Sequence, residues 1–338
     1  MPTNRRDRPS GVTGDDWPSV AVVIPNHSRV AELKEALASV AAQDYPGQIH
    51  TYLVYRSRTE IEPLLSTLGD EVTAIPSIED DGHNPIALKR NAGLRASSED
   101  LVAFLDDDDI WHPQKLSCQI EVIGREPDVV AVTSRSLGFT DELVWPTRQA
   151  EESWKDFTRL DLLGFAGFAT SAMILRGDVA RDLEFDERPE WLAVEDYEFK
   201  SRVSMFGLMR QMDEIHLGYR VSPSSSSSGD ARAMTARVLD VLREIVERPG
   251  GWWVPRFVAL HLVVEALCWR RQPQSLFSED LLTASLTGKF FGPVDRFILL
   301  TIRASWRIGF DIPLMRRLVW QVMRGAQLVE RWRVRRLA

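Results

Sequence analysis

Four consecutive carboxylates, Asp106 to Asp109, directly follow the apolar run at residues 101–105. On an extended backbone, side chains two positions apart point the same way, so Asp106 and Asp108 are expected to share one face. Two such carboxylates repel each other unless a cation lies between them, and oxygen-only ligands suit Mg²⁺ or Mn²⁺ rather than zinc. The alternative is a solvated acidic turn that caps the next helix. The aliphatic strand before the cluster and the Trp-His-Pro sequence after it favour the metal site.

A second acidic pair, Glu195 and Asp196, opens a segment with helical periodicity. Phe199, Val203 and Phe206 recur at helical spacing and mark its predicted buried face. Carboxylates at a helix N-terminus are stabilised by the helix dipole, so capping alone explains an isolated pair. Beside a metal-type acidic cluster the pair gains a chemical function, because a carboxylate placed there could take a proton from a hydroxyl group.

Short apolar runs alternate with helical patterns through the first half of the chain. The predicted strands lie at residues 20–24, 52–55, 71–75, 101–105, 129–133 and 171–175. After the first strand, Ser28 is placed to cap a helix whose apolar residues Val30, Leu33, Leu37 and Val40 follow a 3.6-residue period. This rhythm predicts an α/β fold with a Rossmann-like, mostly parallel sheet and flanking helices, in which ligands bind beyond the carboxyl ends of the strands.

The bulk composition, with 44% hydrophobic and 27% charged residues, is typical of a soluble globular protein. The two cysteines, Cys118 and Cys268, are too few for a disulfide framework, and their separation predicts no metal-ligand cluster and a reducing compartment. Residues 1–17 are polar and lack the apolar core of a signal peptide, which predicts a disordered segment. No run of eighteen apolar residues occurs, so a membrane-spanning helix is not expected.

The C-terminal region, residues 229–338, is predicted to be helical, basic and rich in tryptophan. From Gly250 onward it has 14 Lys and Arg against 6 Asp and Glu, whereas the whole chain has a net charge of −8. Such helices could lie on an anionic membrane surface, or they could pack their tryptophans against the acidic first half, and the sequence leaves both open. The serine run at 224–228 is interpreted as a linker, with a lid over bound ligand as the alternative.

The order of the motifs resembles that of the inverting family 2 glycosyltransferases: a Val-rich strand that ends in proline, an Arg-Asn pair, an Asp-x-Asp motif and a Glu-Asp pair. In this chain they read Val22-Val-Ile-Pro25, Arg90-Asn91, Asp106-Asp-Asp108 and Glu195-Asp196. The resemblance covers residues 20–224. It implies a glycosyltransferase A-type catalytic domain at residues 18–228, followed by the helical C-terminal region.

The resemblance also implies a function for each matched position. Asp106 and Asp108 would hold the Mg²⁺ or Mn²⁺ that bridges the diphosphate of a nucleoside-diphosphate sugar. Asp196 would be the general base, supported by Glu195, and direct attack by the acceptor hydroxyl would invert the anomeric carbon. The donor-binding residues that the resemblance implies are Pro25, Asn26, Arg90, Asn91 and Asp107.

The sequence departs from the family at the end of its second strand, where an acidic residue commonly contacts uridine. Here the chain reads Val54-Tyr55-Arg56, so Tyr55 is the candidate for stacking on the base. A UDP-sugar is favoured as the donor, and another nucleotide stays open.

The Gln-x-x-Arg-Trp motif of processive synthases is absent after Asp196, which favours a non-processive enzyme. The expected acceptor is a glycan or a lipid-linked glycan, and the expected location is the cytoplasm or the inner face of the cell membrane.

Two other classes of function stay open on the sequence alone. A metal-dependent nucleotidyltransferase would need a glycine-rich phosphate loop after the first strand, and residues 25–28 contain no glycine. A non-catalytic relative could bind a nucleotide sugar or act as a membrane-associated scaffold. Nucleic acid is not an expected partner, because the chain is acidic, with a pI of about 5.4, and carries no nucleic-acid-binding motif.

Overall fold

The computed structural model describes residues 17–27, 29–56, 58–77, 83–147, 153–157 and 168–221, together with residues 237, 240, 241 and 244. The chain divides into two compact units, one made of Met1–Phe157 and Gly167–Pro223 and the other of Thr158–Ala166 and Ser224–Ala338. Nearly all of the described residues belong to the first unit. The segment predicted to be disordered and the predicted helical C-terminal region lie almost entirely outside the described residues.

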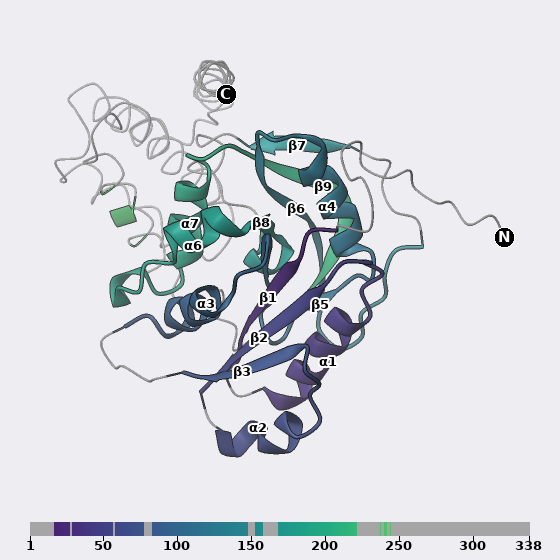
Figure 1. Cartoon of the computed structure of the whole chain (residues 1–338), viewed down its shortest axis with the longest axis vertical. Helices are drawn as coiled ribbons and strands as arrows, with labels where there is room; N and C mark the ends of the chain where they lie inside the picture. Colours follow the sequence, from purple (N-terminus) through teal and green to yellow (C-terminus); the bar gives the residue numbers. More distant parts are fainter. Residues whose placement is uncertain are drawn as a thin grey trace, which may run out of the picture. The chain divides into compact units, whose positions relative to one another are not determined.

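Strands and helices alternate through the first unit, as the sequence predicts (Figure 1). The strands are β1 (Val20–Pro25), β2 (Ile49–Tyr55), β3 (Val72–Pro76), β4 (Leu101–Phe104), β5 (Ile110–Trp111), β6 (Val129–Phe139), β7 (Trp154–Phe157), β8 (Ile174–Arg176) and β9 (Leu208–Arg220). The α-helices are α1 (Val30–Ala41), α2 (Arg58–Leu65), α3 (Pro85–Ala96), α4 (Lys115–Arg125), α6 (Gly177–Leu183) and α7 (Glu195–Val203). Two short 3₁₀ helices, η1 (Thr170–Ala172) and η2 (Pro189–Trp191), precede β8 and α7.

The strands form one sheet in the order β3-β2-β1-β4-β8-β6-β9-β5, with β7 paired to β9. Strands β1 to β4 are parallel to one another, whereas β8 runs antiparallel to both of its neighbours, β4 and β6. The chain advances outward from β1 to β3 and then crosses back through α3 to β4 on the other side of β1. This reversal brings the carboxyl ends of β1 and β4 together, which is where such sheets bind ligands.

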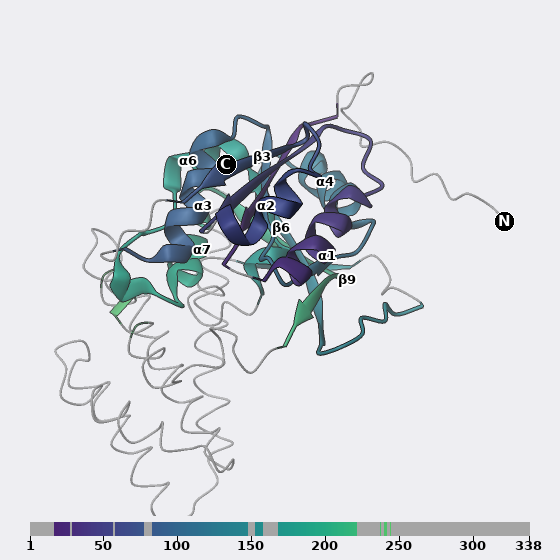
Figure 2. The ribbon, with the colours of Figure 1, turned by 90° about the horizontal axis from the view of Figure 1, so that it is seen from below.

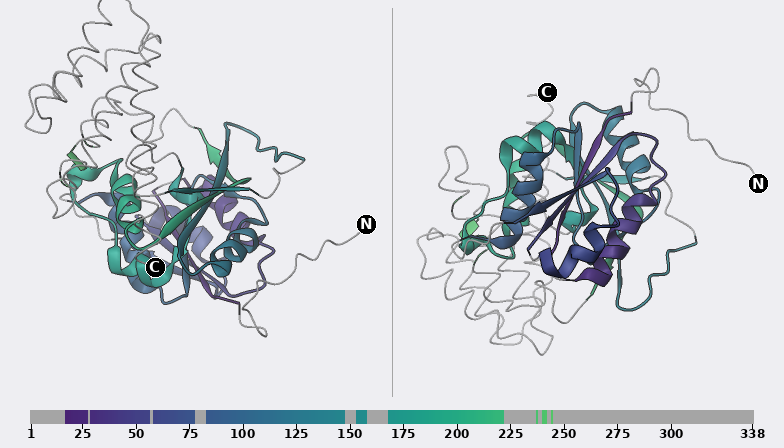
Figure 3. Two further views of the ribbon diagram at one scale, coloured as in Figure 1. Left: turned by 90° about the horizontal axis from the view of Figure 1, so that it is seen from above. Right: turned by 60° about the horizontal axis from the view of Figure 1, so that its bottom comes forward.

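The reversal of strand order also distributes the helices over both faces of the sheet. Helices α1, α2 and α4 cover one face, and α3, α6 and α7 cover the other (Figures 2 and 3). This arrangement confirms the predicted α/β fold with a mostly parallel sheet and flanking helices. It also places α3 and α7, which carry the Arg-Asn and Glu-Asp pairs, on the same face (Figure 1).

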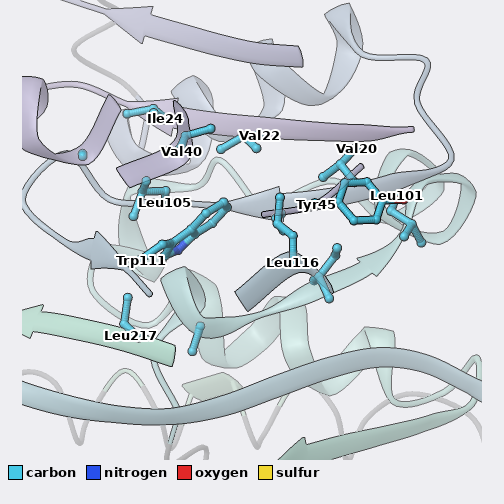
Figure 4. Close-up of a cluster of buried hydrophobic side chains, with 14 of the residues drawn as sticks. Val20, Val22, Ile24, Val40, Tyr45, Leu101, Leu105, Trp111, Leu116 and Leu217 are labelled. Carbon is cyan, nitrogen blue, oxygen red and sulfur yellow. The ribbon is translucent and has the colours of Figure 1, made fainter. Parts of the chain in front are cut away.

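The side chains of β1 alternate between the two helical layers. Val20, Val22 and Ile24 are buried in the hydrophobic cluster on the side of α1, together with Trp111 and other residues (Figure 4). Val23 points to the opposite face, where α3 approaches β1 so closely that a methyl group added to Gly93 would lie 2.4 Å from Cγ1 of Val23. The glycine therefore sets how closely the helix that carries Arg90 approaches the sheet.

The structure corrects several details of the sequence interpretation. The predicted strand at 171–175 is instead the 3₁₀ helix η1 followed by β8. Phe206 is 51% exposed because α7 ends at Val203, so it does not extend the buried face of that helix. Helix α1 begins after Arg29, whose side chain makes no capping bond, and Ser28, the expected cap, lies outside the described residues.

We expect Gly93→Ala to destabilise the protein. Overpacking against the buried Val23 side chain costs about 1–3 kcal/mol, more than the roughly 0.5–1 kcal/mol that alanine gains over glycine in a helix. Gly124→Ala in α4 is the matched control, because an added methyl group there meets no atom within 4 Å. The unfolding midpoint in urea should fall for Gly93→Ala and hold or rise for Gly124→Ala. Equal midpoints for the two variants would contradict this close approach.

Candidate active site

The acidic motif after β4 forms a tight turn. The backbone N–H of Asp109 donates to the carbonyl oxygen of Asp106 over 3.1 Å. The prediction that Asp106 and Asp108 share a face of an extended strand is therefore wrong in its local geometry, because β4 has already ended at Phe104. Because of the turn, its carboxylates form hydrogen bonds and ion pairs with residues in different elements of the fold.

Asp107 joins the turn to the end of β1. Its buried carboxylate accepts hydrogen bonds from Asn26 Nδ2 at 2.9 Å, from the backbone N–H of His27 at 2.8 Å and from Arg29 Nη2 at 2.8 Å. Burial raises the pKa of Asp107, against the opposing effect of Arg29 and the bond from His27. Asn26 and Asp107 were expected to bind the donor directly. In the structure both are buried and bonded to each other, which favours a positioning function over direct contact with the donor.

Asp106 and Asp108 are the more accessible members of the turn, with side chains 37% and 12% exposed. Asp108 forms an ion pair with Arg29. Burial raises the pKa of Asp108 to about 6, with Arg29 opposing the rise and the neighbouring charges of Asp106 and Asp107 adding to it. A cation would relieve this crowding of like charges, and carboxylate oxygens are the ligands that Mg²⁺ and Mn²⁺ prefer. The donor set therefore fits the expected metal.

Asp109 and Arg220 are two residues of this site to which the sequence assigned no function of their own. The backbone N–H of Arg220 donates to Asp109 Oδ1 at 3.1 Å, and its Nε donates to the carbonyl oxygen of Asp108 at 2.9 Å. Arg220 is the last residue of β9, so the sheet itself fixes the turn. Burial raises the pKa of Asp109 well above its ordinary value, with the charge of Asp106 adding to the effect.

Arg90 connects the acidic turn to the start of α7. Its buried guanidinium donates from Nη2 to Asp106 Oδ1 at 2.9 Å and from Nη1 to Glu195 Oε1 at 3.0 Å. The resemblance implied a contact between Arg90 and the nucleotide. In the structure both terminal nitrogens face protein carboxylates, so Arg90 holds two of the motifs together.

Other predicted residues near Arg90 also bond within the protein. Asn91 is fully buried and exchanges hydrogen bonds with the backbone of Phe185, and it also donates to Glu187. Lys89, to which the sequence assigned no function, donates from Nζ to the carbonyl oxygen of Asn26 at 2.8 Å. These bonds fix α3 against the end of β1 and against the loop that leads to α7.

Pro25 and Tyr55 lie at the carboxyl ends of the adjacent strands β1 and β2, as their predicted function requires. The ring of Tyr55, however, is 4% exposed and belongs to the hydrophobic core. This burial favours a packing function over stacking on a nucleotide base. We therefore leave Tyr55 out of the proposed donor site.

The two carboxylates at the start of α7 have different environments. Glu195 is buried, and burial raises its pKa against the opposing charge of Arg90. The side chain of Asp196 is 34% exposed, and it accepts hydrogen bonds from Lys200 Nζ at 2.6 Å and from Thr170 Oγ1 at 3.3 Å. Burial alone would raise the pKa of Asp196, but the charges of Lys200 and Arg90 outweigh it and the pKa is lowered. Asp196 is thus the accessible carboxylate that stays ionised.

Lys200 is a further residue of this site to which the sequence assigned no function. Its side chain is 0% exposed, and its ammonium also donates to the carbonyl oxygen of Phe168 at 2.8 Å. The available signal was its position four residues after Asp196, which places the two side chains on one face of a helix. A buried lysine needs such partners, since an unpaired buried charge is costly.

The fold and the site together define an α/β domain with a mostly parallel sheet, an acidic turn after β4 and a separate carboxylate with a lowered pKa. The family described as "Glycosyltransferase like family 2" matches residues 18–281. The chain therefore belongs to this family, and the resemblance noted in the sequence is confirmed.

Two curated relatives match part of the chain. An N-acetylglucosaminyltransferase of Mesorhizobium japonicum is 30% identical over 158 residues, which are 43% of this chain and 35% of that protein. The glycosyltransferase AglE of Haloferax volcanii is 30% identical over 152 residues, which are 43% of this chain and 47% of that protein. The matches thus span between about a third and a half of the length of these relatives.

Solved structures support the same fold. The crystal structure of S. aureus TarS residues 1–349 in complex with UDP-GlcNAc aligns with a TM-score of 0.60 and 17% identity, covering 87% of this chain and 93% of that chain. A second crystal structure of S. aureus TarS residues 1–349 aligns with a TM-score of 0.59 and 16% identity. At this identity the likeness establishes the fold, and it confirms the expected glycosyltransferase A-type architecture.

We expect Lys200→Met to raise the pKa of Asp196, because the substitution removes the ammonium that stabilises the carboxylate. The pKa can be measured by NMR titration of the carboxyl carbon in the purified chain. Lys155→Met is the control, since Lys155 lies on β7 against Phe157 and does not contact Asp196. An unchanged pKa in Lys200→Met, with the fold intact by circular dichroism, would rule out this electrostatic coupling.

Proposed function

We propose that this protein is an inverting glycosyltransferase that moves a sugar from a nucleoside-diphosphate sugar to an acceptor hydroxyl, with Asp196 as the general base. The observation that carries this proposal is the pairing of Asp196 with the buried Lys200. This pair keeps an accessible carboxylate ionised on the helix that Arg90 ties to the acidic turn.

The two carboxylates of the Glu-Asp pair have different functions in the proposed reaction. Sugar transfer is limited by the weak nucleophilicity of a neutral hydroxyl group, and a carboxylate that removes the proton during attack overcomes this limit. Asp196 is suited to that step because it is ionised and partly exposed. Glu195 is buried against Arg90 and positions α7. Attack by the acceptor on the anomeric carbon, from the face opposite the leaving diphosphate, inverts that carbon and needs no covalent intermediate.

Asp106 and Asp108 are the residues that would hold the divalent ion. When bound, Mg²⁺ or Mn²⁺ neutralises the charge that develops on the departing diphosphate. The protein's own contribution is the fixed shape of the acidic turn, which is held by Asn26 through Asp107 and by Arg220 through Asp109. Such preorganisation avoids rearranging charged groups during the reaction.

A UDP-sugar is the favoured donor. The TarS structure was determined with UDP-GlcNAc, and one partial relative is an N-acetylglucosaminyltransferase, which supports an N-acetylhexosamine as the transferred sugar. The lack of an acidic residue after Tyr55 leaves the base to be settled by experiment. A scaffold that binds no nucleotide is the competing function that the same experiment tests.

The acceptor is proposed to be a glycan or a lipid-linked glycan, extended by one or a few sugars without processive synthesis. Within the described part of the chain, no helix has both the length and the apolar character needed to cross a bilayer. Contact with the inner face of the membrane through the basic C-terminal helices, and a cytoplasmic location, stay predictions because those helices lie outside the described residues.

We expect one nucleoside diphosphate, UDP, to raise the melting temperature in the presence of Mn²⁺, and Asp108→Ala to abolish this shift. A thermal-shift panel of UDP, GDP, CDP and ADP, each with and without Mn²⁺, measures the effect. Asp178→Asn is the control, because this exposed carboxylate lies at the start of α6 and bonds to the backbone of Val179. No shift with any diphosphate would favour the scaffold, whereas a shift that Asp108→Ala retains would remove the metal assignment.

We expect Asp196→Asn to lower turnover by about 10²- to 10⁴-fold, the contribution typical of a general base. Because the amide keeps the shape of the side chain, metal-dependent binding of the diphosphate should stay near the wild-type value. Turnover is measured by release of nucleoside diphosphate from the donor that the panel selects. Near-normal turnover in a folded Asp196→Asn variant would show that another group takes the proton.

A further inference from the structure

A cluster of three potential metal ligands lies between α4 and β9. Cys118 comes from α4, and Glu214 and His216 come from β9. All three residues are buried, and one ligand atom from each lies within 4.8 Å of the other two. The sequence interpretation predicted no metal-ligand cluster because the cysteines are far apart. The fold instead supplies Cys118 with partners almost a hundred residues away.

The backbone of β9 explains why two of these side chains meet Cys118. Residues two apart on a strand point to the same face, so Glu214 and His216 both turn inward. Their register is fixed by β5, since Trp111 pairs with Leu217 and the backbone N–H of His112 donates to the carbonyl oxygen of His216 at 3.0 Å. Helix α4 begins three residues after His112 and places Cys118 over the strand.

The chemistry of this set differs from that of the acidic turn. A thiolate, an imidazole and a carboxylate are together the ligands of Zn²⁺, whereas Mg²⁺ and Mn²⁺ prefer oxygen alone. Around a tetrahedral zinc ion with bonds of about 2.0–2.3 Å, ligand atoms lie roughly 3.5 Å apart. Atoms that already lie within 4.8 Å reach this spacing through small side-chain rotations.

We propose that Cys118, Glu214 and His216 bind a zinc ion, at a site separate from the Asp106–Asp108 pair. The fourth position falls to water or to the ring of His112, whose centroid lies 5.6 Å from that of His216. Binding converts the Cys118 thiol to a thiolate and releases its proton to solvent. No redox change or co-reactant is needed.

The position of the site gives the ion a structural function. Zinc would cross-link β9 to α4, near the β5 edge of the sheet. Four residues beyond His216, β9 ends at Arg220, which fixes the acidic turn through Asp109 and Asp108. An ion that restrains β9 would therefore steady the turn, without contacting the groups proposed to act in sugar transfer.

Metal content and cobalt substitution in the full-length chain test this proposal. We expect about one equivalent of zinc per chain, and we expect Co²⁺ added to the chelator-treated protein to give a thiolate-to-cobalt absorption band that Zn²⁺ abolishes. Cys118→Ser should lose the band, while Cys268→Ser and Asp108→Ala should keep it. Absence of zinc and of the band in the wild type, or persistence of the band in Cys118→Ser, would overturn the proposal.

A second measurement guards against misfolded variants. Zn²⁺ should raise the melting temperature of the wild type and of Asp108→Ala, and it should leave Cys118→Ser and Glu214→Gln unshifted. An equal zinc-induced shift in Cys118→Ser would overturn the site even if that variant is less stable. Because neither experiment measures sugar transfer or nucleotide binding, their outcome is independent of the proposed glycosyltransferase activity.

Discussion

The candidate site depends on the buried guanidinium of Arg90, which binds Asp106 on one side and Glu195 on the other. These carboxylates belong to the acidic turn after β4 and to the first residue of α7, segments that no sheet hydrogen bond joins directly. Leaving one partner of such a buried pair uncompensated costs about 3–5 kcal/mol. The acidic turn and α7, which carries the proposed base Asp196, are therefore held at a fixed separation. The close packing of α3 on β1 at Gly93 sets where Arg90 lies.

Around this arginine the protein pushes the pKa values of its carboxylates in opposite directions. Burial and neighbouring negative charge raise the pKa of Asp108 to about 6, while Lys200 and Arg90 lower that of Asp196. A carboxylate with a raised pKa and like-charged neighbours favours binding a cation, whereas a carboxylate with a lowered pKa stays ready to accept a proton transiently. In the proposed mechanism the acidic residues thereby supply two different functions. Burial and the charges of Asp106 and Asp107 set Asp108 apart although Arg29 opposes them, and Lys200 sets Asp196 apart.

The sequence predicted the fold and singled out the acidic turn and the Glu-Asp pair, because these rest on local signals, namely apolar periodicity and short motifs. It failed where contacts join distant residues. The bond from Arg90 to Glu195 spans 105 positions, and that from Arg220 to Asp109 spans 111, so no motif contains both partners. The extended-strand geometry expected for Asp106 and Asp108 failed for another reason. A run of four carboxylates fits an extended strand and a turn equally well, and the choice depends on the partners that receive each side chain.

The departure from the family at the end of β2 bears on which part of a nucleotide this edge of the sheet would contact. Where relatives commonly carry an acidic residue, Tyr55 packs into the core and Arg56 follows it. Burial lowers the pKa of His27 beyond β1, and the charges of Lys89, Arg56 and Arg29 lower it further, even though Asp107 opposes them. The lowered pKa leaves the His27 ring neutral near pH 7, beside three cations and the Asp107 carboxylate. Under the proposed function, the cations Lys89, Arg56 and Arg29 would attract the diphosphate of a nucleotide whatever its base, and discrimination among bases would fall to neutral hydrogen-bonding groups such as the His27 ring.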